Sequence, residues 1–168
     1  MIPNIVQNDI FWEGKIQLDN WNKFYGEELN LTLNIGGDCI IDGVTKIHEN
    51  GYDYLISKQQ NILEVMLDTV YEHYSTWQDE YGYAADEKEL LMPDIFSSVE
   101  LKTLLYPEKV FIMDIEINEV PYIGVQFRCK WDEEHGVGLM LYKDRVVKVG
   151  GSDTAFMTWI AEEDKENM

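Results

Sequence analysis

The residues best suited to chemistry stand together in the stretch WDEEHGVG, which runs from Trp131 to Gly138. Asp132, Glu134 and His135 are of the types that hold metal ions or transfer protons in hydrolases. A metal-dependent hydrolase is therefore one interpretation of the chain. Such a site would need further ligands, because metal ligands usually come from separated segments and neighbouring residues on a strand point to opposite faces.

The rest of the chain offers no clear second half for that site. The other two histidines, His48 and His73, lie in neither an HxxxH nor a CxxC pattern. Gly136 can take the positive φ of a tight turn, so the stretch also predicts the connection of a β-hairpin, which we favour. A further role for His135 would be to fix the turn by hydrogen bonds or to contact a partner. We predict no catalytic residue, metal or cofactor.

An acidic stripe is the second candidate for function. Glu64, Asp68 and Glu72 are spaced four residues apart, which places them on one face of a helix, and the nearest base, Lys58, cannot neutralise them. The acidity continues beyond the stripe with Asp79 and Glu80. Such a face is either simply solvated or a landing surface for a basic protein partner.

Aromatic residues accompany this acidic region. Tyr71, Tyr74 and Trp77 continue the apolar side of the predicted helix, so we expect them to belong to the core. Tyr81 and Tyr83 follow in a predicted loop and could belong to the core or to an interface, where tyrosine is enriched. A structural homodimer joined through these two tyrosines is a third interpretation.

Composition limits the class of partner. The chain has 168 residues, with 32 acids against 13 bases and a net charge of −19. Such a charge repels nucleic acid and anionic membranes, because binding a polyanion requires clustered Lys and Arg. No apolar run approaches the ~20 residues that span a bilayer, and the first residues do not resemble a signal peptide. Two cysteines are too few for a disulfide framework, so we expect a cytoplasmic protein.

The elements that must position these residues predict an α+β fold. Alternating apolar residues indicate strands at 9–18 and 29–35, and a C-terminal meander over 109–117, 122–131, 136–144 and 145–151. A long helix is expected from Ser57, with a capping box to Gln60, to about Thr76, followed by a loop and a short helix at 96–105. We expect one domain over 1–160, with an antiparallel sheet, both helices packed on one face, and a charged, frayed tail over 161–168.

Three stretches together resemble an uncharacterised bacterial domain family with an early W-x-G strand, a W-D-x-E-H-G-x-G segment and a V-G-x-x-D-x-[AF] stretch. The matching residues are Trp12, Gly14, Trp131, Asp132, Glu134, His135, Gly136, Gly138, Val149, Gly150, Asp153 and Ala155. The acidic helix lies outside this resemblance. The resemblance implies a binding role similar to that of immunity proteins encoded beside bacterial toxins, and it assigns no catalytic residues.

The leading hypothesis is therefore a cytoplasmic binding protein of the immunity or antitoxin type, which neutralises a basic toxin domain. Charge complementarity would speed the encounter and reject wrong partners. The residues predicted to carry the binding are Glu64, Asp68, Glu72, Asp79, Glu80 and Tyr81.

Overall fold

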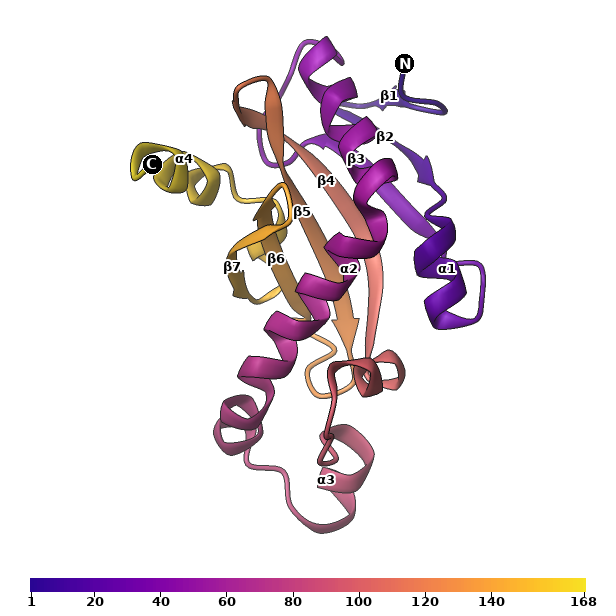
Figure 1. Ribbon diagram of the computed structural model, residues 1–168, viewed down its shortest axis with the longest axis vertical. Coiled ribbons are helices and arrows are strands. Elements are labelled where there is room, and N and C mark those ends of the chain that lie inside the picture. Colours follow the sequence, from indigo (N-terminus) through magenta and orange to yellow (C-terminus); the bar gives the residue numbers. More distant parts are fainter.

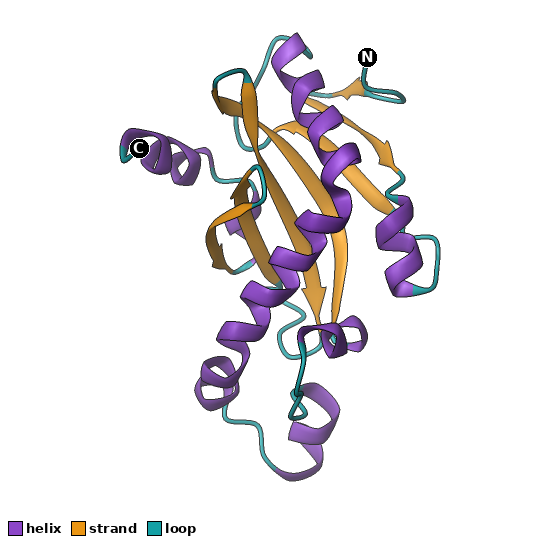
Figure 2. Cartoon of the chain, in the orientation of Figure 1, coloured by secondary structure: helices purple, strands orange, loops and turns teal.

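The computed structural model describes residues 1–168 and confirms the α+β class, with one seven-stranded sheet whose strands follow the chain order (Figures 1 and 2). All neighbouring strands are antiparallel except β3 and β4, which are parallel because a long helical crossover separates them. The strands are β1 (Val6–Asn8), β2 (Phe11–Ile16), β3 (Leu31–Gly36), β4 (Leu105–Ile117), β5 (Val120–Cys129), β6 (Val137–Tyr142) and β7 (Arg145–Gly150).

One helix dominates the rest of the molecule. It crosses one face of the sheet diagonally, and its last turns continue beyond the ends of the strands together with the next helix (Figure 1). No helix is both long enough and apolar enough to cross a membrane. The helices are α1 (Asp19–Tyr25), α2 (Lys46–Tyr81), α3 (Ala85–Leu91) and α4 (Thr158–Glu166), with short 3-10 helices η1 (Ser98–Thr103) and η2 (Ser152–Ala155).

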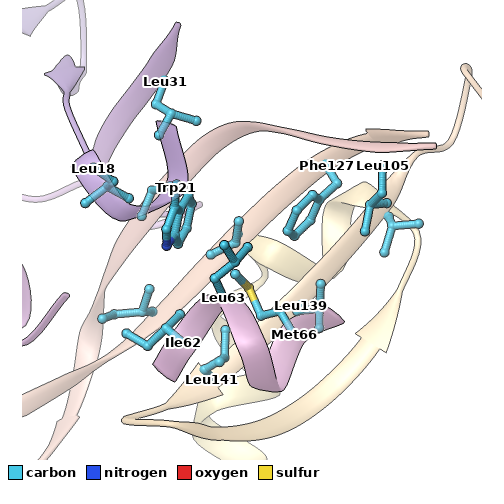
Figure 3. Close-up of a cluster of buried hydrophobic side chains, with 14 of the residues drawn as sticks. Leu18, Trp21, Leu31, Ile62, Leu63, Met66, Leu105, Phe127, Leu139 and Leu141 are labelled. Atoms are coloured by element: carbon cyan, nitrogen blue, oxygen red, sulfur yellow. The ribbon is translucent and has the colours of Figure 1, made fainter. Parts of the chain in front are cut away.

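The main core lies between α2 and the sheet. Ile62, Leu63 and Met66 recur at helical spacing on the buried side of α2, and they face Phe127 of β5 and Leu139 of β6 (Figure 3). Full burial of each such side chain contributes roughly 1.5–3 kcal/mol. The periodicity of the sequence therefore identified the correct face of this helix.

A second, smaller core covers the opposite face of the sheet. Met113 and Tyr122 point away from α2 and pack with Ile160 of α4. The backbone of η2 crosses this face so closely that a Cβ at Gly124 would lie 1.5 Å from the carbonyl oxygen of Ala155. Because both faces are covered, β5 and β6 are buried almost continuously rather than at alternate positions.

The long helix begins earlier than its capping signal predicts. Its N-terminal cap is Thr45, whose side chain and backbone form a capping box with His48. Ser57, the predicted start, lies next to a kink at Lys58, where φ is −116° and ψ is 17°. The expected loop after the helix also differs, because α2 continues to Tyr81 and residues 85–91 form α3.

The tail is helical instead of frayed as far as Glu166. Asp164 of α4 accepts hydrogen bonds from Arg145 of β7 at 2.8 Å and from the Tyr122 hydroxyl at 2.6 Å. The charge of the tail therefore holds it to the sheet, because its carboxylate meets an arginine from a different part of the sequence.

Candidate functional site

The two features predicted separately from the sequence meet at one end of the molecule. Tyr81, in the last turn of α2, donates a hydrogen bond to the Asp132 carboxylate at 2.6 Å. Tyr83 donates to the carbonyl oxygen of Trp131 at 2.7 Å. The two tyrosine rings are stacked, with centroids 6.0 Å apart. The end of the acidic helix is thus attached to the turn between β5 and β6.

Trp131 holds that turn against the C-terminal part of α2. Its side chain is buried and packs edge-on against Tyr74, with ring centroids 5.5 Å apart. The Trp77 ring also packs near it, with ring centroids 6.2 Å apart. Tyr74 belongs to the main core and Trp77 packs against it, which confirms the prediction that both lie on the packed face of α2. Such aromatic pairs each contribute about 0.5–1.5 kcal/mol beyond their buried area.

The charged residues of the turn are ordered by one carboxylate. Asp132 accepts the backbone N–H of His135 at 3.0 Å, and His135 Nδ1 lies 3.0 Å from the same carboxylate oxygen. Gly136 then takes a positive φ of 62° and donates its N–H to the Asp132 carbonyl. The segment therefore forms the connection between antiparallel β5 and β6, as the glycine predicts.

These contacts shift the ionisation of the groups in the turn. Partial burial of Asp132 opposes its charge, but the hydrogen bonds from Tyr81 and His135 outweigh this effect and lower its pKa. The hydrogen bond and negative charge of Asp132 raise the pKa of His135. Burial, and then the hydrogen bond to Asp132, raise the pKa of Tyr81. Near pH 7, Asp132 is therefore negative and Tyr81 is neutral, and the exposed His135 beside them has a raised pKa.

A cleft of about 430 Å³ opens where α2, the β5–β6 turn and the end of β7 meet. The His135 side chain is 70% exposed at this cleft, whereas that of Asp132 is only 15% exposed. Glu80 is exposed and forms no hydrogen bond or ion pair with another side chain. We call this feature the aromatic cleft; its principal side chains are Trp77, Glu80, Tyr81, Trp131, Asp132 and His135.

The acidic stripe lies on the side of α2 opposite the core. Glu64, Asp68 and Glu72 are all exposed, and none of them forms an ion pair. Only Glu64 has a side-chain partner, the amide of Gln60 at 2.9 Å. Asp79 is also exposed and unpaired. The negative charge of this surface is therefore not neutralised within the chain.

The other two histidines do not join His135 in a metal site. His48 lies at the opposite end of α2, where its side chain is buried against Asp114 at 2.8 Å. His73 stacks on Trp77 with centroids 5.5 Å apart, and Glu134 is exposed without a hydrogen-bond partner. No three His, Cys, Asp or Glu side chains are placed to hold a metal ion.

The pairing of Trp77 with Trp131 is the part of the site that sequence reasoning missed. Both residues stand out individually, one in the helix stripe and one in the WDEEHG segment, but they are 54 positions apart in the sequence. Local periodicity carries no information on contacts over such distances. The two adjacent glycines that line the cleft, Gly150 and Gly151, were predicted only as a turn.

Comparison with protein-family models gives one match, to the family described as "Domain of unknown function (DUF6985)", over residues 6–157. Neither the search of curated proteins nor the search of solved structures found a match. The matched region includes the whole sheet, α2 and the aromatic cleft. The chain therefore belongs to this family of unknown function.

Proposed function

We propose that this member of the DUF6985 family is a binding protein that captures a basic protein domain through α2, in the manner of an immunity or antitoxin protein that neutralises a toxin. The observation that carries the proposal is the acidic stripe, whose three carboxylates are exposed and without a basic neighbour. Like charges at this spacing cost roughly 0.2–0.5 kcal/mol per pair in an isolated helix. A stripe that costs stability and forms no internal ion pair is best explained by a partner.

The position of the stripe supports the same proposal. The opposite side of α2 is fixed on the sheet by Ile62, Met66 and Val70, which are fully buried, so the stripe is presented by a rigid element. A preformed surface loses little conformational freedom on binding. A negative patch on a protein with a net charge of −19 attracts a basic partner and raises the association rate by tenfold or more at low salt.

The decisive experiment reverses the charge of the stripe. A partner captured by the wild-type chain is purified, and its association rate is measured with wild type and with the triple variant Glu64→Lys, Asp68→Lys, Glu72→Lys. We expect the rate to fall by about tenfold or more at low salt and to lose most of its dependence on ionic strength. If the partner is a toxin, co-expression of the variant should also fail to restore growth.

A matched control separates the stripe from net charge alone. Glu162, Glu163 and Glu166 are exposed on α4, which covers the opposite face of the sheet, and their replacement by Lys changes the charge by the same amount. This variant should associate within about threefold of wild type. An unchanged association rate for the stripe variant, or an equal loss in both variants, would show that the stripe is not the binding surface.

A further inference from the structure

The aromatic cleft stands beside the acidic stripe, and its chemistry differs from that of the stripe. Trp77, Tyr81 and Trp131 supply three aromatic rings around it, and its one basic side chain, His135, is paired with Asp132. Glu80 contributes a carboxylate with no internal partner. Aromatic rings combined with a free carboxylate attract an organic cation, because the ring faces are negative and the carboxylate adds charge.

From this combination we infer that the aromatic cleft is an anchor site for an arginine side chain of the basic partner. A guanidinium group is planar, weakly hydrated and able to stack on aromatic rings while it hydrogen-bonds a carboxylate, so it fits this lining better than an ammonium group. The volume of about 430 Å³ lies at the lower end of the range for ligand sites, roughly 300–1,000 Å³. It therefore suits one side chain rather than a folded segment.

The walls of the cleft are already held in place. Tyr81 is fixed by its 2.6 Å hydrogen bond to Asp132, and Trp131 is buried and packs on both Tyr74 and Trp77. Both Asp132 oxygens have partners inside the chain, which leaves Glu80 as the carboxylate available to a ligand. A preorganised aromatic pocket next to a charged surface has the arrangement of a binding hot spot, in which a few anchors carry most of the binding energy.

The inference deepens the proposed function, because it names the side chain that a basic partner would insert, but it can be tested without the partner. The probe is N-acetyl-arginine amide, and its neutral isostere N-acetyl-citrulline amide is the comparison. In the ¹⁵N-labelled full chain, the indole N–H signals of Trp77 and Trp131 report on the cleft. Trp21 provides an internal reference, because its indole N–H is bonded to the Gln59 carbonyl within the core.

We expect the arginine probe to shift the Trp77 and Trp131 signals in a saturable way at millimolar concentration, with no shift at Trp21 and none with the citrulline probe. Glu80→Gln should weaken the arginine probe by about fivefold. Asp53→Asn removes the same charge from an exposed position of the same helix outside both the cleft and the stripe, and should change the affinity by less than about twofold.

Three results would overturn the arginine site: no saturable shift at Trp77 and Trp131, equal shifts with both probes, or equal weakening by Asp53→Asn and Glu80→Gln. The outcome is independent of the proposed function. If the arginine probe fails while charge reversal of the stripe still slows the partner, the cleft is not an anchor but the stripe remains the binding surface.

Discussion

Two histidine–aspartate pairs lie near opposite ends of α2. They consist of the same residue types but differ in how far the histidine is buried. At the N-terminal end, His48 Nε2 lies 2.8 Å from Asp114, and the histidine side chain is 1% exposed. At the C-terminal end, His135 Nδ1 lies 3.0 Å from Asp132, and its side chain is 70% exposed. The same residue types therefore form a structural joint in one place and border an open cleft in the other.

The difference arises from what lies beneath each end of the helix. The N-terminal turns rest directly on the sheet, where a Cβ at Gly51 would lie 2.5 Å from Pro121 Cγ. The C-terminal turns continue beyond the strands (Figure 1) and are held by aromatic residues and by the Tyr81 hydroxyl. Residue type alone thus does not indicate function; burial and the availability of an unpaired neighbour do.

The largest effect on stability is expected at the buried pair. His48→Ala removes the acceptor of the Thr45 backbone N–H at 3.0 Å and leaves a cavity in the core. We expect a loss of about 2–4 kcal/mol in the free energy of unfolding, measured by urea denaturation. His73→Ala, an exposed change on the same helix, should cost less than about 0.5 kcal/mol. Equal losses of stability in the two variants would show that the buried His48 has no special structural role.

The close contact of Gly51 with the sheet, at the same end of α2, should be nearly as sensitive to substitution. At Gly51, an added methyl group would lie within 3.0 Å of both Pro121 and Ile112. Although alanine favours helix by about 1 kcal/mol, the overlap should make Gly51→Ala destabilising by about 1–3 kcal/mol. Gly43→Ala is the control, because its methyl group would meet only Trp12 at 4.0 Å. A stabilising Gly51→Ala would show that the N-terminal turns are loosely packed.

A smaller effect is expected where α2 is attached to the turn. Tyr81→Phe removes the hydroxyl that donates to Asp132, and Asp132→Asn weakens the acceptor. A double-mutant cycle should give a coupling energy of about 0.5–1.5 kcal/mol, typical of a partly exposed hydrogen bond to a charged group. Additive losses within about 0.3 kcal/mol would indicate that the two side chains do not act on each other.

The exposed pair of His135 and Asp132 should affect stability mainly in a pH-dependent way. Because Asp132 raises the pKa of His135 above its ordinary 6.5, the stabilisation from His135 is fully present below pH 6.5 and disappears as pH rises through the raised pKa. The lowered pKa of Asp132 gives stabilisation that is present above its ordinary 3.8 and disappears as pH falls through the lowered value. The pair therefore contributes most between pH 3.8 and 6.5.

An NMR titration of the His135 ring protons checks this prediction. The wild-type midpoint should lie above 6.5, and Asp132→Asn should bring it back toward 6.5. His73, which faces no carboxylate, provides a comparison in the same spectra. A His135 midpoint that does not respond to Asp132→Asn would contradict the hydrogen bond between them.

The sequence predicts the sheet and the site to different extents. Alternation of apolar residues located the strands from β2 to β7, and the four-residue spacing of Ile62, Met66 and Val70 identified the buried side of α2. The predicted start of α2 was wrong because Gly51 lowers the helix propensity of its first turns. Glycine is favoured at this position because a larger residue would overlap Pro121 and Ile112.

The assembly of the site was beyond local patterns. Tyr81 and Asp132 were both singled out, but nothing in the spacing indicates that they share a hydrogen bond, because this contact depends on how far α2 extends past the sheet. Residues 81–89 were expected in a loop, and α3 was missed because it buries none of its side chains and so lacks an apolar stripe.

The central claim is that the C-terminal part of α2 and the β5–β6 turn form the surface for a basic partner, whereas the N-terminal turns are structural. Amide hydrogen exchange of the full chain, alone and saturated with the captured partner, tests this most directly. We expect new protection over residues 64–81 and 131–136 and none over 46–53. Protection confined to α4 and β7, or to the β1–β2 edge, with unchanged exchange along α2, would contradict it.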